Sequence, residues 1–346
     1  MTTREHILSH CARYPLLQCE DLLKFLHQST FGPGHLIRED FDGEAFLRRE
    51  SQGRSGGEAE ALDGDFFRLP LGGEFACDTL WRCFVLSASM PTGTADDLER
   101  RLACALQLAQ EGLLPFSAAE LSTAAENWRK NGFPARHHSS AFRAAYDPAY
   151  RVMHKSFLPL LPLLQAVDQK RGGITPLLIA IDGGAGSGKS TLGAQLRSIY
   201  RCPLLHMDDF FLRPHQRTPQ RLALAGGNVD RERFEEEVLR PCRAGLPIAY
   251  RRYDCGTQTL LPPQEISPAP LVIVEGSYSC HPALRPYYDL TVYLDISPAL
   301  QRRRIERRNS PEMQQRFFDI WIPMEQRYFE AFSIPQLCDL VLEVSE

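Results

Sequence analysis

The spacing of apolar residues changes near the middle of the chain. Before residue 169, apolar positions recur at i, i+3, i+4 and i+7, as in residues 19–31 (CEDLLKFLHQSTF) and 95–114 (ADDLERRLACALQLAQEGLL), which predicts amphipathic helices. After residue 176, short apolar runs alternate with helical stretches; the runs are PLLIAID, PLLHM, PLVIVEG, LTVYLDI and LVLEV. This alternation predicts an α/β fold with a sheet of roughly five parallel strands, flanked on both faces by helices.

The segment between the two patterns is typical of a connection. Residues 169–176 (QKRGGITP) combine two charges, a glycine pair and a proline, which favours a hinge or linker. We therefore expect a mainly α-helical domain at 1–168 and an α/β domain at 177–346. Within the first domain, residues 66–75 (FFRLPLGGEF) favour a short hairpin, and the Gly-, Ser- and Glu-rich residues 51–65 favour a mobile surface loop.

Composition narrows the classes of partner. The 346 residues are 43% hydrophobic and 24% charged, which is typical of a globular protein with a real core. The formal net charge of −4 gives no case for nucleic-acid or membrane partners, because both favour a basic surplus. Ten scattered cysteines without a Cys-x-x-Cys pair, and a start without an apolar leader core, indicate a reducing, cytoplasmic setting. Self-association as a homo-oligomer stays open.

The strongest local signal is a complete phosphate-binding pattern. IDGGAGSGKSTL places G-x-x-x-x-G-K-[ST] between a predicted strand and a predicted helix. Glycines let backbone N–H groups curl around phosphate oxygens, a lysine brings positive charge to the terminal phosphates, and a serine hydroxyl can ligate Mg²⁺. The residues predicted to bind the nucleotide are Gly183, Gly184, Ala185, Gly186, Ser187, Gly188, Lys189, Ser190 and Thr191.

Two motifs that would indicate other classes of P-loop protein are absent from the sequence. No Asn-Lys-x-Asp guanine motif follows it, which weighs against a GTPase. No Leu-Ser-Gly-Gly-Gln signature is present either, which weighs against a transporter ATPase. The choice between ATP and GTP as phosphoryl donor stays open, and the acceptor has to be identified from other residues.

Further segments follow the P-loop in order. They are MDDFF, GGNVDRERFEEEVL, YRRYDCGTQTL and LVIVEGSY, the last followed by the arginine-rich QRRRIERRN. With these segments, residues 177 to about 332 resemble the uridine kinase and phosphoribulokinase family of P-loop kinases. The resemblance implies the P-loop kinase fold, ATP and Mg²⁺ as cofactors, and a small-molecule hydroxyl as the acceptor of the phosphoryl group.

The resemblance also assigns catalytic residues. Asp208 matches the family's aspartate one strand after the P-loop and would accept or orient the acceptor proton, whereas Asp209 is expected to have a local structural role. Lys189 belongs to the same predicted catalytic set. Arg304 and Arg308 join it because QRRRIERRN is similar to the family's lid over the transferred phosphoryl group. The alternative for this helix is a solvated basic face.

The predicted metal ligands are oxygen donors. LVIVEGSY is similar to the family's Walker-B-like strand, whose terminal carboxylate is Glu275 here, and the resemblance implies that Glu275 holds Mg²⁺ with Ser190 and Asp208. The alternative for Glu275 is a strand end facing solvent. Four apolar residues before it and a glycine after it favour a buried strand that delivers a carboxylate.

Substrate-binding residues are assigned by the same resemblance. Asp230 matches the aspartate that holds sugar hydroxyls in nucleoside kinases, although a helix N-cap is a second role for it. Tyr253 and Asp254 match the segment Y-D-F-x-x-H-x-R. Gln258 replaces its base-contacting histidine and Leu260 its arginine, which weighs against uridine and cytidine. The expected acceptors are another nucleoside, a pantothenate-like alcohol or a sugar derivative.

The first half of the chain has no counterpart in uridine kinases, and its role stays open. Residues 27–37 (HQSTFGPGHLI) and 135–153 (ARHHSSAFRAAYDPAYRVM) concentrate His, Ser, Arg and Tyr. Such a cluster either binds an anionic or sugar-like ligand or packs within the protein. A second hypothesis for the whole chain is a regulator, in which the P-loop half binds nucleotide without phosphorylating a metabolite and the first half is the effector.

Overall fold

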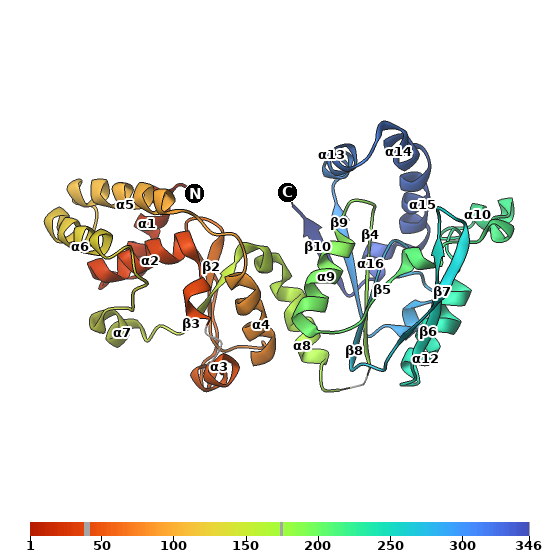
Figure 1. Cartoon of the computed structure of the whole chain (residues 1–346), viewed down its shortest axis with the longest axis horizontal. Helices are drawn as coiled ribbons and strands as arrows, with labels where there is room; N and C mark the ends of the chain where they lie inside the picture. Colours follow the sequence, from red (N-terminus) through yellow and green to blue (C-terminus); the bar gives the residue numbers. More distant parts are fainter. Residues whose placement is uncertain (38–41, 174–175, 346) are drawn as a thin grey trace. The chain divides into compact units, whose positions relative to one another are not determined.

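The computed structural model of the chain describes residues 1–37, 42–173 and 176–345. The chain divides into two compact units, Met1–Gln169 and Lys170–Glu346 (Figure 1). The division falls at the start of the predicted linker 169–176, of which residues 174–175 lie outside the described part. Each unit has a hydrophobic core of its own, so each is a separate packing unit.

The N-terminal unit is mainly helical and contains one small sheet. Its helices are α1 (Thr3–Arg13), α2 (Cys19–Phe31), α3 (Gly43–Ser51), α4 (Cys77–Ala88), α5 (Ala95–Gln110), α6 (Ala118–Lys130), α7 (Ser140–Tyr146) and α8 (Leu161–Lys170). Its strands are β1 (Glu60–Ala61), β2 (Phe66–Pro70) and β3 (Tyr150–His154). Apolar faces of α1, α2, α5 and α6 form the core, in which Leu22, Leu102 and Trp128 are fully buried.

The predicted hairpin at residues 66–75 is wrong, because its first strand pairs with other segments of the chain. Phe66–Pro70 is a strand, but it pairs antiparallel with Glu60–Ala61 on one side and with Tyr150–His154 on the other. After β2 the chain passes through Gly72 and Gly73, both with positive φ, and continues into α4 without forming a second hairpin strand. Part of the predicted loop 51–65 is therefore β1 of this sheet.

The C-terminal unit contains the five predicted parallel strands in one sheet, in the order β10-β9-β4-β8-β5. The strands of the unit are β4 (Leu177–Gly183), β5 (Leu204–His206), β6 (Ile248–Asp254), β7 (Thr259–Ile266), β8 (Leu271–Glu275), β9 (Leu290–Ile296) and β10 (Leu340–Val344). Its helices are α9 (Lys189–Tyr200), α10 (Pro219–Ala223), α11 (Arg231–Phe234), α12 (Arg240–Arg243), α13 (Pro298–Arg308), α14 (Pro311–Arg316), α15 (Ile322–Phe332) and α16 (Ile334–Leu337).

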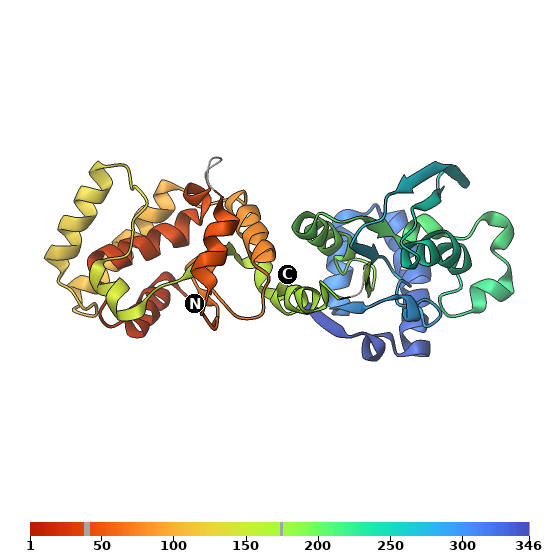
Figure 2. The same ribbon diagram turned by 90° about the horizontal axis from the view of Figure 1, so that it is seen from below.

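Helices cover both faces of this sheet (Figures 1 and 2). Leu178 and Ala180 of β4 belong to a core shared with Phe234 of α11 and Tyr328 of α15. Ile179 points to the opposite face, where α9 packs against β4, β5 and β8. Because both faces of the inner strands β4, β8 and β9 are buried, these strands are almost continuously apolar. Polar side chains are left to the ends of the strands, where a parallel α/β sheet binds its ligands.

One pair of strands was not expected. β6 and β7 form an antiparallel hairpin outside the main sheet, with a register shift between Arg251 and Tyr253. From the sequence, the segment YRRYDCGTQTL was predicted to bind substrate, and no strands were predicted in it. Across the residues that the structure describes, no helix is both long and apolar enough to cross a lipid bilayer.

Candidate active site

The glycine-rich loop joins the central strand β4 to α9. Gly183, the last residue of β4, has a φ of +145°, and a Cβ there would lie 2.7 Å from the carbonyl oxygen of Leu294. Glycine is required at this position because a side chain would suffer both backbone strain and a clash. The loop then enters the N-terminus of α9, where backbone N–H groups and the helix dipole favour an anion.

Lys189, the first residue of α9, reaches back across the loop. Its Nζ donates hydrogen bonds to the carbonyl oxygens of Gly183 and Gly184 at 2.8 and 3.0 Å. The ammonium group therefore lies at the mouth of the loop rather than on the outer surface of the helix. A phosphate held by the loop N–H groups would meet this charge.

Ser190 and Glu275 place oxygen donors side by side next to the loop. Ser190 Oγ donates to Glu275 Oε1 at 3.1 Å, and His206 Nδ1 lies 2.5 Å from the same oxygen. The hydrogen bond to Glu275 raises the pKa of His206. Mg²⁺ takes one or two protein oxygens together with phosphate oxygens and water, so this pair fits it. Within the described ranges, no cluster of three or more His, Cys, Asp or Glu residues is arranged for a metal.

The adjacent carboxylates Asp208 and Asp209 have different surroundings. Asp209 is buried, and it accepts hydrogen bonds from Arg252 Nε at 2.9 Å and from the Tyr250 hydroxyl at 3.2 Å. Asp208 is reached by solvent and has no hydrogen bond or ion pair with any residue that the structure describes. Nearby protein atoms exclude part of its water and raise the pKa of Asp208, while the charge of Lys189 opposes this shift. The free carboxylate next to the P-loop is therefore Asp208.

Asp182 was missed by the sequence analysis. Although it directly precedes the glycine loop, its side chain is fully buried, and burial raises its pKa to about 6. The Tyr328 hydroxyl of α15 donates to it at 2.9 Å. Backbone N–H groups of three residues also donate to it, namely Gly183, Tyr278 and Cys280. Asp182 therefore ties the start of the loop to the segment after β8. Its position between an apolar strand and the first loop glycine was the available signal.

Glu325 and Gln301 hydrogen-bond the backbone of the glycine-rich loop, and neither was predicted from the sequence. Glu325 Oε2 accepts from the Ala185 N–H at 2.8 Å, and its Oε1 accepts from Ser277 Oγ at 2.6 Å. Gln301 Nε2 donates to the Ala185 carbonyl oxygen at 2.9 Å. These side chains lie more than a hundred residues from the loop in sequence, so no local pattern indicates them.

The substitution Glu325→Ala is expected to destabilise the P-loop. It leaves the buried N–H of Ala185 without its acceptor, which costs about 1–3 kcal/mol, and the hydroxyl of Ser277 keeps only its 3.2 Å contact with the Gly183 carbonyl oxygen. We expect a lower free energy of unfolding and weaker ATP binding, measured by urea titration and calorimetry. The control is Glu330→Ala, which removes an exposed carboxylate from the same helix. Equal stability and equal ATP affinity in the two variants would show that Glu325 does not hold the loop.

The two predicted lid arginines differ in their contacts. Arg304 Nη1 donates to the carbonyl oxygens of Gly186 and Ser187 at 3.1 and 3.4 Å, so α13 lies directly against the P-loop. Arg308 is exposed and makes no hydrogen bond or ion pair among the described residues. Arg304 is thus brought to the loop, and Arg308 lies one turn further along the helix.

Asp230 is the N-cap of α11. Its Oδ1 accepts from the Arg233 N–H at 3.3 Å, and its Oδ2 accepts from Gln216 Nε2 at 2.8 Å. Its own N–H donates to the Phe210 carbonyl oxygen at 2.7 Å, which places it beside the Asp208 segment. The capping role is therefore present, and Oδ2 also faces the guanidinium groups of Arg213 and Arg233 at 3.8 and 3.6 Å.

The remaining predicted substrate residues lie at the end of the β6–β7 hairpin. The Tyr253 hydroxyl accepts from Arg217 Nη2 at 2.9 Å. Asp254 accepts from the Gly256 N–H at 2.8 Å and from Thr257 Oγ1 at 3.0 Å, which stabilises the turn. Gln258 is exposed in this turn, with a φ of +57°. The pair of Arg252 and Asp209 joins the hairpin to the Asp208 segment, as described above.

The arrangement of strand, loop and helix decides the fold of this half. A glycine loop of the P-loop pattern follows the central strand of a five-stranded parallel sheet and enters a helix. The C-terminal unit has the P-loop kinase fold. No protein-family model matches the chain.

Solved structures resemble about half of the chain. A possible uridine kinase from Bacillus stearothermophilus is 21% identical with a TM-score of 0.42, and covers 54% of this chain and 99% of its own. A candidate fructose transport system kinase from Silicibacter sp. TM1040 is 22% identical with a TM-score of 0.45, and covers 53% and 98%. A shikimate kinase from Bacteroides thetaiotaomicron is 15% identical with a TM-score of 0.27, and covers 49% and 86%. These likenesses concern the fold of one half only.

Proposed function

We propose that the C-terminal unit is an ATP-dependent kinase that phosphorylates a hydroxyl group of a small molecule. The observation that carries the proposal is the unpaired carboxylate of Asp208 beside the P-loop. A protein that only binds nucleotide has no use for a free carboxylate at the acceptor side of the loop. Its neighbour Asp209 is fully engaged in structural contacts, so the difference is specific to one position.

The proposed reaction is an in-line transfer. Asp208 accepts the proton of the acceptor hydroxyl while the oxygen of that hydroxyl forms a bond to the γ-phosphorus of ATP. The bond from that phosphorus to the β-γ bridging oxygen breaks. The products are a phosphate monoester and ADP. Lys189 and Arg304 supply positive charge near the transferred group, since both contact the loop backbone. Ser190 and Glu275 would hold Mg²⁺, which neutralises phosphate charge when bound.

The acceptor side favours a polar, hydroxyl-rich molecule. The carboxylate of Asp230 can accept hydrogen bonds from a pair of hydroxyls when these displace the contacts that its Oδ2 makes with Gln216, Arg213 and Arg233. Gln258 is free to contact the far end of a substrate, because it is exposed and makes no hydrogen bond among the described residues. We infer that the acceptor is nucleoside-like or another small polyol.

The test is a screen of nucleosides, pantothenate-like alcohols and sugars with ATP and Mg²⁺, followed by ADP release. We expect ADP release that depends on one class of acceptor. The regulatory alternative predicts ATP binding with no acceptor-dependent ADP release. That result for every acceptor class would contradict the proposed kinase.

The pH dependence of turnover follows from Asp208. Desolvation raises its pKa above the ordinary value of an aspartate, with Glu275 adding to the shift and Lys189 opposing it. Because the base is active only when ionised, kcat should rise with pH through this raised pKa and level off above it. The measurement is kcat between about pH 4 and 8. An acid limb at the ordinary pKa of a solvated aspartate would contradict this assignment.

A further inference from the structure

The two polar stretches of the N-terminal unit come together in space. His27 lies on α2, and the Gly-Pro-Gly turn after α2 brings His35 back beside it, with ring centroids 4.9 Å apart. Gly32 makes this turn possible, because its φ is +57° and a Cβ would lie 2.4 Å from the ring of Phe66. The segment after α6 runs across the same region, and Lys24 Nζ donates to the Arg136 carbonyl oxygen at 2.9 Å.

Four basic residues lie on the segments that meet here; we call Lys24, His35, Arg136 and His137 the cationic cluster. Burial first, and then the charges of Lys24 and His137, lower the pKa of His35. Burial lowers the pKa of Lys24 to about 8. The charges of Lys24 and His137 therefore disfavour a charge on His35, which is a cost that a bound anion would remove.

The cationic cluster has no acidic partner among the residues that the structure describes. Neither Lys24, His35, Arg136 nor His137 forms an ion pair there. The one acid near Lys24 is Asp21, and both of its oxygens are occupied by His138 and Ser139. Lys24 and Arg136 are half-buried, and such cations usually have a carboxylate beside them.

Arg136 has an unused donor. Its Nε is buried and has no hydrogen-bond partner. The guanidinium lies 5.9 Å from the ring centroid of the fully buried Trp128, whose Nε1 donates to the Pro134 carbonyl oxygen at 2.8 Å. This contact supports the arginine side chain on a rigid platform, as a ligand-binding residue requires.

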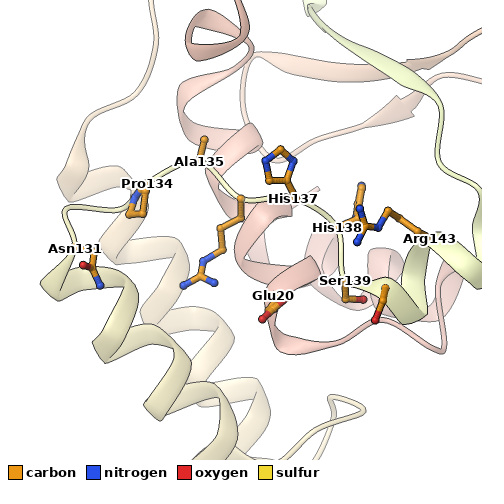
Figure 3. A pocket seen from close by; sticks show the side chains of 10 residues that line it. Glu20, Asn131, Pro134, Ala135, His137, His138, Ser139 and Arg143 are labelled. Atoms are coloured by element: carbon orange, nitrogen blue, oxygen red, sulfur yellow. The ribbon is translucent and has the colours of Figure 1, made fainter. Parts of the chain in front are cut away.

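An open hollow of about 720 Å³ adjoins the cationic cluster at Arg136 and His137, which belong to its lining. Figure 3 shows its wall, in which Pro134, His137 and Ser139 follow one another along the chain and Glu20 of α2 faces them. Its lining is rich in donors and includes one acid; the residues are Glu20, Asn131, Pro134, Ala135, Arg136, His137, His138, Ser139, Ser140 and Arg143. The space is large enough for a phosphorylated metabolite rather than an ion alone.

We propose that the N-terminal unit binds a phosphate-bearing small molecule, whose phosphate group is held by Lys24, His35, Arg136 and His137 and whose remainder occupies the hollow. A dianion suits several cations that lack a carboxylate, and arginine and lysine are the side chains that bind phosphate oxygens most readily. This site is separate from the P-loop and goes beyond the kinase function proposed above.

The test uses the fluorescence of Trp128 in the full chain. The variant Trp81→Phe/Trp321→Phe leaves Trp128 as the single tryptophan, so the signal comes from the N-terminal site and not from the P-loop. The probes are inorganic phosphate, glucose 6-phosphate and glucose. We expect a saturable change with the phosphate ester and none with glucose. Saturation by inorganic phosphate alone would identify the free ion as the ligand of the same site.

Charge-removing variants in this background test the named residues. His35→Gln and Arg136→Ala should each weaken the affinity for glucose 6-phosphate about tenfold or more, because each removes a charge-assisted hydrogen bond. The matched control is Arg100→Ala, which removes an exposed arginine paired with Asp97. Circular dichroism confirms that the variants are folded. No saturable change with either phosphate probe, or unchanged affinity in both test variants, would overturn the proposal whatever the kinase assay shows.

Discussion

The substitution Asp208→Asn is expected to lower kcat about a hundredfold or more, because the amide cannot accept the proton of the acceptor hydroxyl. ATP affinity should stay within about twofold, since asparagine keeps the shape of the side chain and the phosphates are held by the loop. Calorimetry with ATP and a steady-state assay with the acceptor measure the two quantities. Near-normal turnover in this variant would remove Asp208 from the mechanism.

The same variant should be more stable than the wild type at neutral pH. The pKa of Asp208 is raised in the folded state, so ionisation of this group disfavours folding, and the disadvantage is present above the folded pKa and lost as pH falls below the unfolded pKa. Asp209→Asn is the matched control and should be less stable, because Arg252 and Tyr250 lose a buried carboxylate. At pH 7, the midpoint of thermal unfolding should be higher than that of the wild type in Asp208→Asn and lower in Asp209→Asn. At pH 4, the gain of Asp208→Asn should be smaller.

The substitution Lys189→Ala is expected to lower kcat/KM about a hundredfold to a thousandfold, because it removes the charge at the mouth of the loop. A second effect is more specific. Since Lys189 lowers the pKa of Asp208, its loss should move the acid limb of the kcat profile to higher pH. The measurement is the pH dependence of the residual turnover.

The control for this prediction is Lys130→Ala, which removes an exposed lysine at the end of α6. It should change neither turnover nor the pH profile. A loss of turnover in Lys189→Ala without any movement of the acid limb would separate Lys189 from Asp208 and contradict their electrostatic contact.

The strands of the main sheet could be predicted because the information is local. Each of the five is a short apolar run between turn signals, and β4, β8 and most of β9 are buried on both faces. The β6–β7 hairpin was not predicted, because its exposed residues alternate irregularly and its register shifts between Arg251 and Tyr253. The pairing of β2 with β3 was missed for another reason: the strands are separated by about eighty residues, and register between distant strands leaves no local pattern.

The candidate site divides in the same way. The P-loop and Asp208 belong to motifs that are contiguous in sequence, so they could be named from the residues alone. Asp182 was missed because a buried acid has no pattern beyond its neighbours, and Glu325 because its contact with Ala185 spans 140 residues. In the N-terminal unit, both polar stretches were noticed, but only the fold brings His35 near the segment of Arg136.

The proposed kinase reaction transfers a phosphoryl group from ATP to a small-molecule hydroxyl on the C-terminal unit. The most direct measurement follows the label of γ-labelled ATP in the presence of the acceptor found by the screen, with wild type and Asp208→Asn compared side by side. We expect wild type to move the label into a stable phosphate ester of the acceptor, and we expect no such transfer in Asp208→Asn. Label that remains in ATP, or is released only as inorganic phosphate, would contradict it.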